Sequence, residues 1–389
     1  MERLPIKSLI RFTSVSKRWR FIILSDPNFA KSQFQQTRSH RVLCFDWREP
    51  EFESRDLETL WSTGDNSKDR KLRCPFKNPG DELRSLSSCN GLVCATLSPR
   101  YSIDLDIYIW NPSTQFYKKL PASPLRVQRV PHVRCYGFGY LSATGDYKVL
   151  INNLYSLNIE HHIFSSNSNI WKRIAVPFRF HMDVAGTLSN EALHWIDKEI
   201  LAFDLTHEKF RTMLLPDFKP GQCIMELGDF RGCLCALDCL YRHASFIDLW
   251  VMKEYNVSES WTKLFTLKIS DRPVRMQSLR LIMVMETGTV LEKAPISEGR
   301  VFVTEFKLIK SGHKENKFET HKVSRELYGN THMIGYEESL LWLGDRPCGT
   351  SQEGKNASEA GGRIMENVQG KMNVTVDNQG PNHVNVCVL

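Results

Sequence analysis

Apolar and polar positions alternate along this chain in a phrase that recurs about every 45–48 residues. The phrase is a short apolar strand, a polar turn, an aromatic residue and a closing apolar residue or proline. It covers residues 106–121, 154–174, 200–216 and 248–267. The aromatic residues inside the four first strands are Trp110, Tyr155, Phe203 and Trp250. A repeat of this length made of short strands is typical of β-propeller blades, so we predict a mainly β, β-propeller-like fold of short antiparallel strands.

Further short strands are predicted between these phrases, which gives three to four strands per repeat. They lie at 137–150, 186–196 and 228–237. The outer repeats are less regular, and five or six repeats can be counted. Residues 300–323 predict a fifth, with Phe302 or Phe306 in its strand and Phe318 as its later aromatic, and residues 333–343 are expected to close the ring. Residues 42–47 predict an early strand, followed by a polar insertion at 48–85.

The repeated aromatic residues admit two interpretations, a ligand-binding cage or a packing role copied in each blade. Their regular spacing favours packing, because an aromatic side chain that points inward buries a large area at low entropic cost. We therefore predict that Trp110, Tyr155, Phe203 and Trp250 are structural core residues.

Residues 1–41 follow a helical pattern instead. Pro5 suits the first turn of a helix, where its missing N–H has no intrahelical partner to lose. Ser16 is placed to cap a second helix, and Asp26 with Pro27 provides a cap and first-turn proline for a third. We predict three short helices over 1–41, a β domain over 42–343, and a tail over 344–389 whose Gly, Asn, Ser and Glu content predicts disorder.

Charge is concentrated at the N-terminus. The 389 residues carry a net charge of +7, and residues 1–41 contain nine Lys or Arg against Glu2 and Asp26, so this segment alone holds +7. Such a basic segment predicts an acidic partner. No secretory signal and no apolar run of membrane-spanning length is visible, so we expect a cytoplasmic or nuclear protein that does not enter a membrane. The eleven cysteines, an odd number, are then expected to be reduced.

No catalytic motif stands out. Cys233, Cys235 and Cys239 lack zinc-module spacing and are interpreted as core thiols rather than a metal site. Asp104 and Asp106 are interpreted as strand-end or turn residues. Residues 161–162, two histidines, are assigned to a loop, and His194 to a hydrogen-bonded, half-buried position. We predict no enzyme activity, cofactor or metal. An enzyme on a propeller, such as a glycan hydrolase or copper oxidase, is the alternative and would need an acidic or metal-binding cluster on one rim.

Nucleic acid is a second possible partner for the basic segment. Recognition of nucleic acid needs basic residues on one face together with stacking aromatic residues. Trp19 and the phenylalanines of this segment fall on the apolar faces of the predicted helices, where packing uses them. We therefore predict no nucleic-acid binding.

Taken together, these segments resemble a known family. Residues 3–34 closely resemble the second half of a plant F-box. Residues 87–94, 110–121, 137–150, 191–196, 200–205 and 248–267 resemble, in order, the signatures of the plant F-box-associated (FBA) interaction domain, a kelch-like propeller. Each phrase alone is weak, whereas the ordered set from 3 to 343 is highly specific.

The resemblance implies a substrate receptor of a Skp–cullin–F-box ubiquitin ligase, which does no chemistry itself. The F-box would bind a Skp-type adaptor, and through it the cullin, while the β domain would capture an unidentified target protein. The residues that match the family's adaptor-binding helices are Leu4, Pro5, Leu9, Ile10, Val15 and Trp19. The family's first F-box helix is absent from this sequence, so a truncated F-box is expected, with weakened or lost adaptor binding. The alternative is a target-binding module that recruits no ligase.

Overall fold

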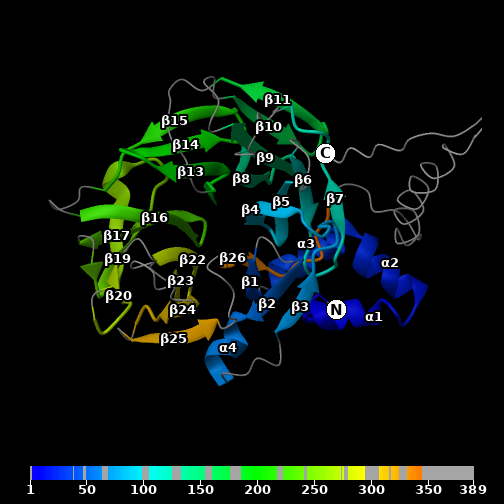
Figure 1. The fold of residues 1–389 in the computed structure, drawn as a ribbon, viewed down its shortest axis with the longest axis horizontal. Helices are drawn as coiled ribbons and strands as arrows, with labels where there is room; N and C mark the ends of the chain where they lie inside the picture. The colour runs from blue at the N-terminus through cyan, green and yellow to red at the C-terminus, as the bar shows by residue number, and fades with distance from the viewer. Residues whose placement is uncertain are drawn as a thin grey trace, which may run out of the picture. The chain divides into compact units, whose positions relative to one another are not determined.

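The computed structural model describes residues 2–37, 39–46, 50–63, 69–98, 105–124, 133–153, 160–175, 185–216, 222–240, 243–272, 274–275, 279–293, 306–314, 317–323 and 331–343. Among these residues, three helices precede six four-stranded antiparallel sheets that surround a common centre as a six-bladed β-propeller (Figure 1). This arrangement confirms the predicted mainly β, propeller-like fold and sets the blade number at six.

We name the blades A to F in ring order and give their strands from the centre outward. Blade A contains β26 (Thr331–Glu337), β1 (His40–Asp46), β2 (Glu51–Asp56) and β3 (Arg70–Arg73), and blade B contains β4 (Glu82–Cys89), β5 (Leu92–Ser98), β6 (Asp106–Trp110) and β7 (Tyr117–Lys119). Blade C contains β8 (Val133–Leu141), β9 (Asp146–Asn153), β10 (His161–Ser165) and β11 (Ile170–Ile174). Blade D contains β12 (Thr187–Ser189), β13 (Ala192–Ile196), β14 (Ile200–Asp204) and β15 (Lys209–Met213).

The last two blades follow the same order. Blade E contains β16 (Gln222–Phe230), β17 (Cys233–Leu240), β19 (Phe246–Met252) and β20 (Trp261–Lys268), with a short 3-10 helix, η1 (Ser258–Ser260), before β20. Blade F contains β22 (Leu279–Met285), β23 (Gly288–Lys293), β24 (Phe306–Ser311) and β25 (Phe318–Val323). Two short strands, β18 (His243–Ala244) and β21 (Val274–Arg275), pair with each other outside the blades.

Blade A closes the ring with strands from both ends of the propeller sequence. β26 pairs with β1 in antiparallel register from His40↔Glu337 to Asp46↔Thr331. Residues 333–343 therefore close the ring as predicted, although the strand itself ends at Glu337. The polar insertion predicted at 48–85 is wrong, because this segment supplies β2, β3 and the helix α4 (Leu57–Thr63) to blade A. Its charged side chains misled the prediction, since β2 and β3 are the outer strands of their sheet.

In blades B, C and D the repeated aromatic position lies on the third strand, opposite an aromatic residue of the fourth strand, whereas Trp250 of blade E pairs with Lys263. Trp110 pairs with Tyr117 in blade B, and Phe203 pairs with Phe210 in blade D. In blade C this position belongs to Phe164, which pairs with Trp171. Tyr155, the residue predicted there, lies outside the described residues. The spacing is therefore uneven, 54 residues from 110 to 164 and 39 from 164 to 203.

These aromatic side chains form much of the packing within and between blades. The side chains of Trp110, Phe164 and Phe203 are fully buried. The ring centroids of Trp110 and Phe52 are 5.3 Å apart, so the Trp110 side chain of blade B packs against neighbouring blade A. Trp250 is only half-buried, and its indole nitrogen donates a hydrogen bond to Asp238. Full burial of one such ring contributes roughly 2–3 kcal/mol relative to exposure.

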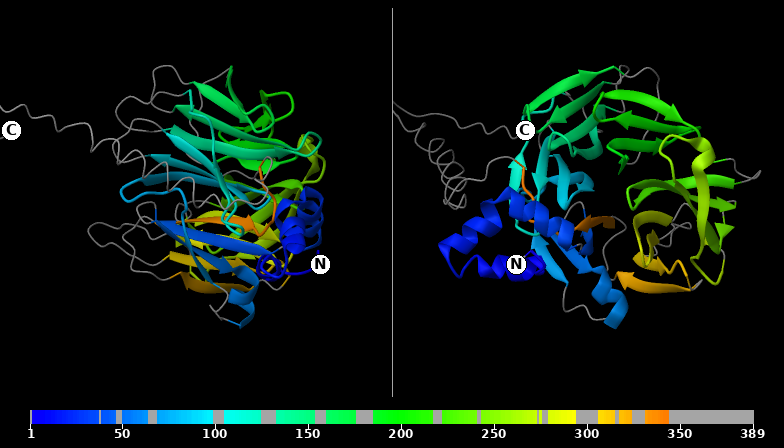
Figure 2. Two further views of the ribbon diagram at one scale, coloured as in Figure 1. Left: turned by 90° about the vertical axis from the view of Figure 1, so that its right-hand side faces the viewer. Right: turned by 180° about the vertical axis from the view of Figure 1, so that it is seen from behind.

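The N-terminal helices begin where the sequence places their caps. α1 (Ile6–Phe12) follows Pro5, α2 (Lys17–Ser25) follows Ser16, and α3 (Pro27–Gln36) follows Asp26. The Ser16 hydroxyl accepts a hydrogen bond from the Trp19 amide, and the Asp26 carboxylate accepts two from the start of α3. These caps satisfy amides that have no partner inside the helix. Figure 2 shows the blue helices beside blade A.

Only three residues separate α3 from β1, so the boundary predicted after residue 41 falls two residues inside β1. The tail predicted at 344–389 lies outside the described residues. Within the described part of the chain, every helix is too short or too polar to cross a membrane.

Candidate interaction surface and its anchor

The helices share a hydrophobic core with a segment from the far end of the propeller. The buried members of this core are Ile6, Leu9, Ile23, Phe29, Ala30 and Leu340. Partly buried side chains surround it, among them Leu4, Ile10, Trp19 and Leu341. Three helices of 7, 9 and 10 residues bury little surface alone, so the contact with Leu340 completes their core.

The residues predicted to bind an adaptor occupy different environments. Leu9 is fully buried and therefore supports the helical core. Leu4, Ile10 and Trp19 are half-buried, and Trp19 also packs edge-on against Phe12 with ring centroids 5.4 Å apart. Pro5 and Val15 are exposed, and Val15 is 68% exposed. The structure thus leaves all of them except Leu9 with some accessible surface.

The prediction that the phenylalanines of residues 1–41 fall on apolar helix faces is wrong for Phe21. It is 56% exposed, the second most exposed large apolar side chain of the helices after Val15. A helical wheel places it about 200° from Trp19, on the polar side of α2. An apolar residue in that position is the signal that could have identified it. In the N-terminal segment that holds the helices, Val15 and Phe21 are accompanied by exposed basic side chains, namely Arg3, Lys7, Arg11, Lys17, Arg18, Arg20 and Lys31.

The segment that reaches the helices comprises residues 338–343, and we call it the clasp. It follows β26 directly, and its first backbone amide, that of Glu338, donates to the carbonyl oxygen of Ser39 in the linker between α3 and β1. The Glu338 carboxylate forms a 2.6 Å ion pair with Arg70 of β3. Leu340 enters the helical core, whereas Leu343 packs into the core between blades B and C.

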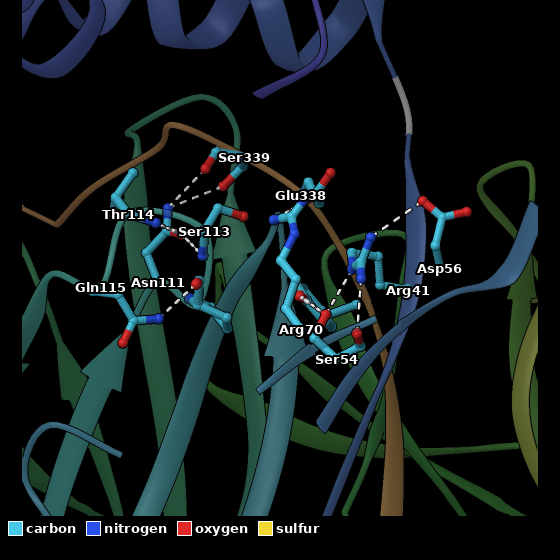
Figure 3. Close-up of polar contacts among 12 residues, drawn as sticks. Arg41, Ser54, Asp56, Arg70, Asn111, Ser113, Thr114, Gln115, Glu338 and Ser339 are labelled. Carbon is cyan, nitrogen blue, oxygen red and sulfur yellow. Dashed lines mark hydrogen bonds and ion pairs between the residues drawn. The ribbon is translucent and has the colours of Figure 1, made fainter. Parts of the chain in front are cut away.

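Asn111 anchors the clasp to blade B (Figure 3). Its side-chain nitrogen donates hydrogen bonds to the carbonyl oxygens of Ser339, at 3.0 Å, and Leu341, at 2.9 Å. Its side-chain oxygen accepts hydrogen bonds from the amides of Ser113 and Thr114, which form the turn after β6. Asn111 is fully buried, so these bonds satisfy an amide that would otherwise be desolvated without partners.

A buried arginine stabilises the strands beneath the clasp. The Arg41 guanidinium donates to the hydroxyl of Ser54, to the carbonyl oxygen of Ser54 and to the carboxylate of Asp56, as Figure 3 shows. The Ser54 hydroxyl lies 2.7 Å from the Tyr336 hydroxyl of β26. Three strands of blade A are thereby linked through one fully buried cation whose charge is compensated.

The cysteines of the described residues are packed thiols rather than nucleophiles. Cys235 is buried and Cys233 half-buried, both on β17; the side chain of Cys239 lies outside the described part. Burial raises the pKa of the Cys44 thiol to about 12 and that of Cys74 to about 11, so both are protonated at neutral pH. Over the described ranges, no three His, Cys, Asp or Glu side chains converge as metal ligands.

The histidines and aspartates that the sequence singled out have structural surroundings. The loop predicted for residues 161–162 is wrong, because both are strand residues of β10, and burial lowers the pKa of His161 to about 4. His194 is fully rather than half-buried, with its ring nitrogens 2.8 Å from the Tyr255 hydroxyl and 3.2 Å from a backbone oxygen. Asp106 begins β6 and pairs with Lys119 at 2.7 Å. Asp104 lies outside the described residues.

Comparisons with known proteins match both parts of the chain. The family described as "F-box associated beta propeller domain" matches residues 54–340, and the F-box domain matches residues 1–31. The F-box protein CPR1 of Arabidopsis thaliana is 30% identical over 306 residues, which cover 68% of this chain and 70% of that protein. The F-box/kelch-repeat protein At3g23880 of the same plant is 29% identical over 339 residues, which cover 77% of this chain and 86% of that protein. Among solved structures, TolB from Acinetobacter baumannii is 10% identical with a TM-score of 0.46, covering 77% and 66%.

Proposed function

Because this chain belongs to the family of F-box proteins with an F-box-associated β-propeller domain, we propose that it is the substrate-recognition subunit of a Skp–cullin–F-box ubiquitin ligase. The observation that carries the proposal is the coincidence of the F-box match with the three helices and of the propeller match with the six blades. The helices would bind the Skp-type adaptor, and the β domain would capture the target protein in the cytoplasm or nucleus.

The surface of the helices supports an acidic protein as the partner. Val15 and Phe21 expose apolar side chains among basic ones, and exposed aromatic anchors of this kind dominate many protein interfaces. The +7 charge of residues 1–41 would steer an acidic adaptor toward them. We propose that Val15 and Phe21 contact the adaptor together with Leu4, Pro5, Ile10 and Trp19, while Leu9 acts from inside the core.

The mechanism we propose is proximity rather than catalysis. A target held on the β domain would reach a high effective concentration near a conjugating enzyme that other subunits carry.

Binding to a purified plant Skp-type adaptor tests the proposal with the full chain and calorimetry. We expect Phe21→Asp and Val15→Asp each to weaken binding at least about tenfold, since each places a carboxylate on an apolar contact with an acidic partner. Trp19→Ala is less informative because Trp19 also packs on Phe12. Ile170→Asp on β11 is the matched control, because Ile170 is 63% exposed and distant in sequence from the helices.

Two results would contradict the proposal. One is a wild-type chain that does not bind the adaptor, and the other is equal binding by wild type, Phe21→Asp and Val15→Asp. Recovery of a target protein with neither adaptor nor cullin would support the alternative of a binding module that recruits no ligase.

A further inference from the structure

The helices are attached to the propeller at two points. The first is the three-residue linker between α3 and β1. The second is the clasp, whose Leu340 is fully buried in the helical core although it follows the last strand of the ring. A domain joined by a linker alone can rotate about it, whereas a second attachment that is fixed at both sides removes that freedom.

We propose that the clasp holds the helices in one fixed orientation on blade A, so that the helices and the β domain move as a single body. The orientation itself follows from the contacts described above. Its consequence for ubiquitin transfer rests on the proposed function, because a rigid receptor would present its target at a constant distance from the adaptor. The clasp would then be a positioning device rather than a binding surface.

The hydrogen bonds of Asn111 are the first support for a fixed orientation. The two carbonyl oxygens that Asn111 holds belong to Ser339 and Leu341, the residues on either side of Leu340. The backbone around Leu340 is therefore bound to the turn after β6, while the Leu340 side chain packs among the helices. Displacing the helices would require Leu340 to leave their core or Asn111 to lose both buried acceptors.

Close packing against a second turn of blade B is the second support. Gly91, in the turn between β4 and β5, has φ +74°, and a Cβ atom there would overlap the Ser339 side chain and the carbonyl oxygen of Glu337. The Glu338 amide is bound to Ser39, and the Glu338 carboxylate is bound to Arg70. The clasp thus contacts blade A, blade B and the linker within three residues, which leaves it little room to shift.

The length of the linker is the third support. The last helical residue is Gln36 and the first strand residue is His40, and the Thr37 hydroxyl in between donates to the carbonyl oxygen of Glu2. The linker is thereby tied back to the start of the helical segment. The linker leads directly into β1 of blade A, the blade that also closes the ring.

Amide hydrogen exchange on the full chain, without any adaptor, tests the proposal. We expect Leu340→Ala to increase exchange in α1–α3 at least tenfold more than in β13 and β14 of blade D, because the helices would open without the ring opening. Asn111→Ala is the second variant, and it removes the hydrogen bonds of the clasp but leaves the helical core intact. The same selective increase is expected for it.

Leu205→Ala is the matched control. Leu205 is also a fully buried leucine, but it packs in the core of blades C and D. It should increase exchange near blade D and leave α1–α3 protected. Unchanged protection of α1–α3 in a folded Leu340→Ala or Asn111→Ala protein would overturn the proposal, as would equal loss of helix protection in Leu205→Ala. If Leu340→Ala does not fold, Asn111→Ala decides.

Because no adaptor is present, this experiment fails or succeeds independently of the proposed function. Selective opening of the helices in a chain that binds no adaptor would support the clasp proposal and contradict the proposed ligase role. Adaptor binding without selective opening of the helices would support the proposed ligase role and contradict the clasp proposal.

Discussion

The side-chain nitrogen of Asn111 lies 3.0 Å from the carbonyl oxygen of Ser339, 228 residues further along the chain. A contact of such sequence separation is formed only when the ring is complete. It joins a turn of blade B to the segment that enters the helical core, so one buried amide connects the two functional parts of the molecule.

We expect Asn111→Ala to lower the free energy of unfolding by about 2–4 kcal/mol. The substitution removes hydrogen bonds to two backbone carbonyl oxygens and two backbone amides, and the buried groups would lose their partners. Urea denaturation followed by tryptophan fluorescence measures the loss. Asn167→Ala is the control, because the side-chain nitrogen of Asn167 also donates to a backbone oxygen but is exposed, and we expect a change below about 1 kcal/mol there. Equal losses at both sites would contradict this reasoning.

Gly91→Ala should destabilise the protein more than Gly232→Ala. Both glycines have positive φ, +74° and +80°, so both substitutions impose a backbone strain of about 1 kcal/mol. Only at Gly91 would the added Cβ meet the clasp, since nothing lies within 4 Å of a Cβ at Gly232. The extra loss at Gly91, expected to exceed about 2 kcal/mol, therefore measures the close approach of the clasp. A thermal melt of the two variants compares them, and identical melting temperatures would show that the clasp yields freely.

Glu292→Gln should stabilise the protein at high pH. Burial raises the pKa of Glu292 to about 7, with Arg280 opposing this shift from 3.9 Å. As pH rises from 4.5, the unfolded chain loses this proton before the folded chain does, so wild-type stability declines until the folded group ionises near pH 7. The gain from Glu292→Gln should therefore be larger by roughly 2–3 kcal/mol at pH 8 than at pH 5.

Chemical denaturation at pH 5 and pH 8 measures this difference. Glu286→Gln is the control, because Glu286 forms an exposed ion pair with Arg231 whose removal should change stability by less than about 1 kcal/mol. A gain from Glu292→Gln that is the same at both values would show that the folded protein does not hold this proton.

His194 should have the opposite pH dependence. Burial lowers the pKa of His194 to about 4, so the folded protein keeps the imidazole neutral. As pH falls below 6.5, the unfolded chain binds a proton that the folded chain does not, and stability is lost down to about pH 4. This effect amounts to about 2 kcal/mol at pH 5.

The variant His194→Gln removes this titration, so its stability should fall less than that of wild type between pH 7 and pH 5. Packing changes caused by the substitution act equally at both values and cancel in the comparison. Gln36→Ala, at an exposed position whose side chain does not titrate, should retain the wild-type slope. The expectation fails if His194→Gln loses as much stability on acidification as the wild type.

Local chemistry in the sequence predicted the elements well. Ser16 and Asp26 marked the starts of α2 and α3 because capping depends on neighbouring residues alone. The regular spacing of the repeated aromatic residues predicts a packing role for Trp110 and Phe203, and both are fully buried. In blade C the even spacing predicts Tyr155, whereas the equivalent residue is Phe164, because the connections between strands differ in length and break the even spacing.

The clasp was not predictable in the same way. Leu340 belongs to a sequence stretch that resembles a closing strand, and it differs from its neighbours only by what it contacts far away in the chain. Asn111 resembles an ordinary turn residue, and its turn hydrogen bonds agree with that interpretation. Its hydrogen bonds to Ser339 and Leu341 join residues far apart in the chain, so no repeating pattern in the sequence predicts them. Helices could be predicted from local residues, but their attachment could not.

The pairing of β1 with β26 has a consequence for synthesis on the ribosome. β1 leaves the exit tunnel early, and its partner emerges only after the other five blades have been translated. Until then β1 exposes the edge of an incomplete sheet, and unpaired edges promote aggregation. A messenger that ends before residue 331 would release a product whose first sheet lacks its inner strand, and such a product would depend on chaperones or be degraded itself.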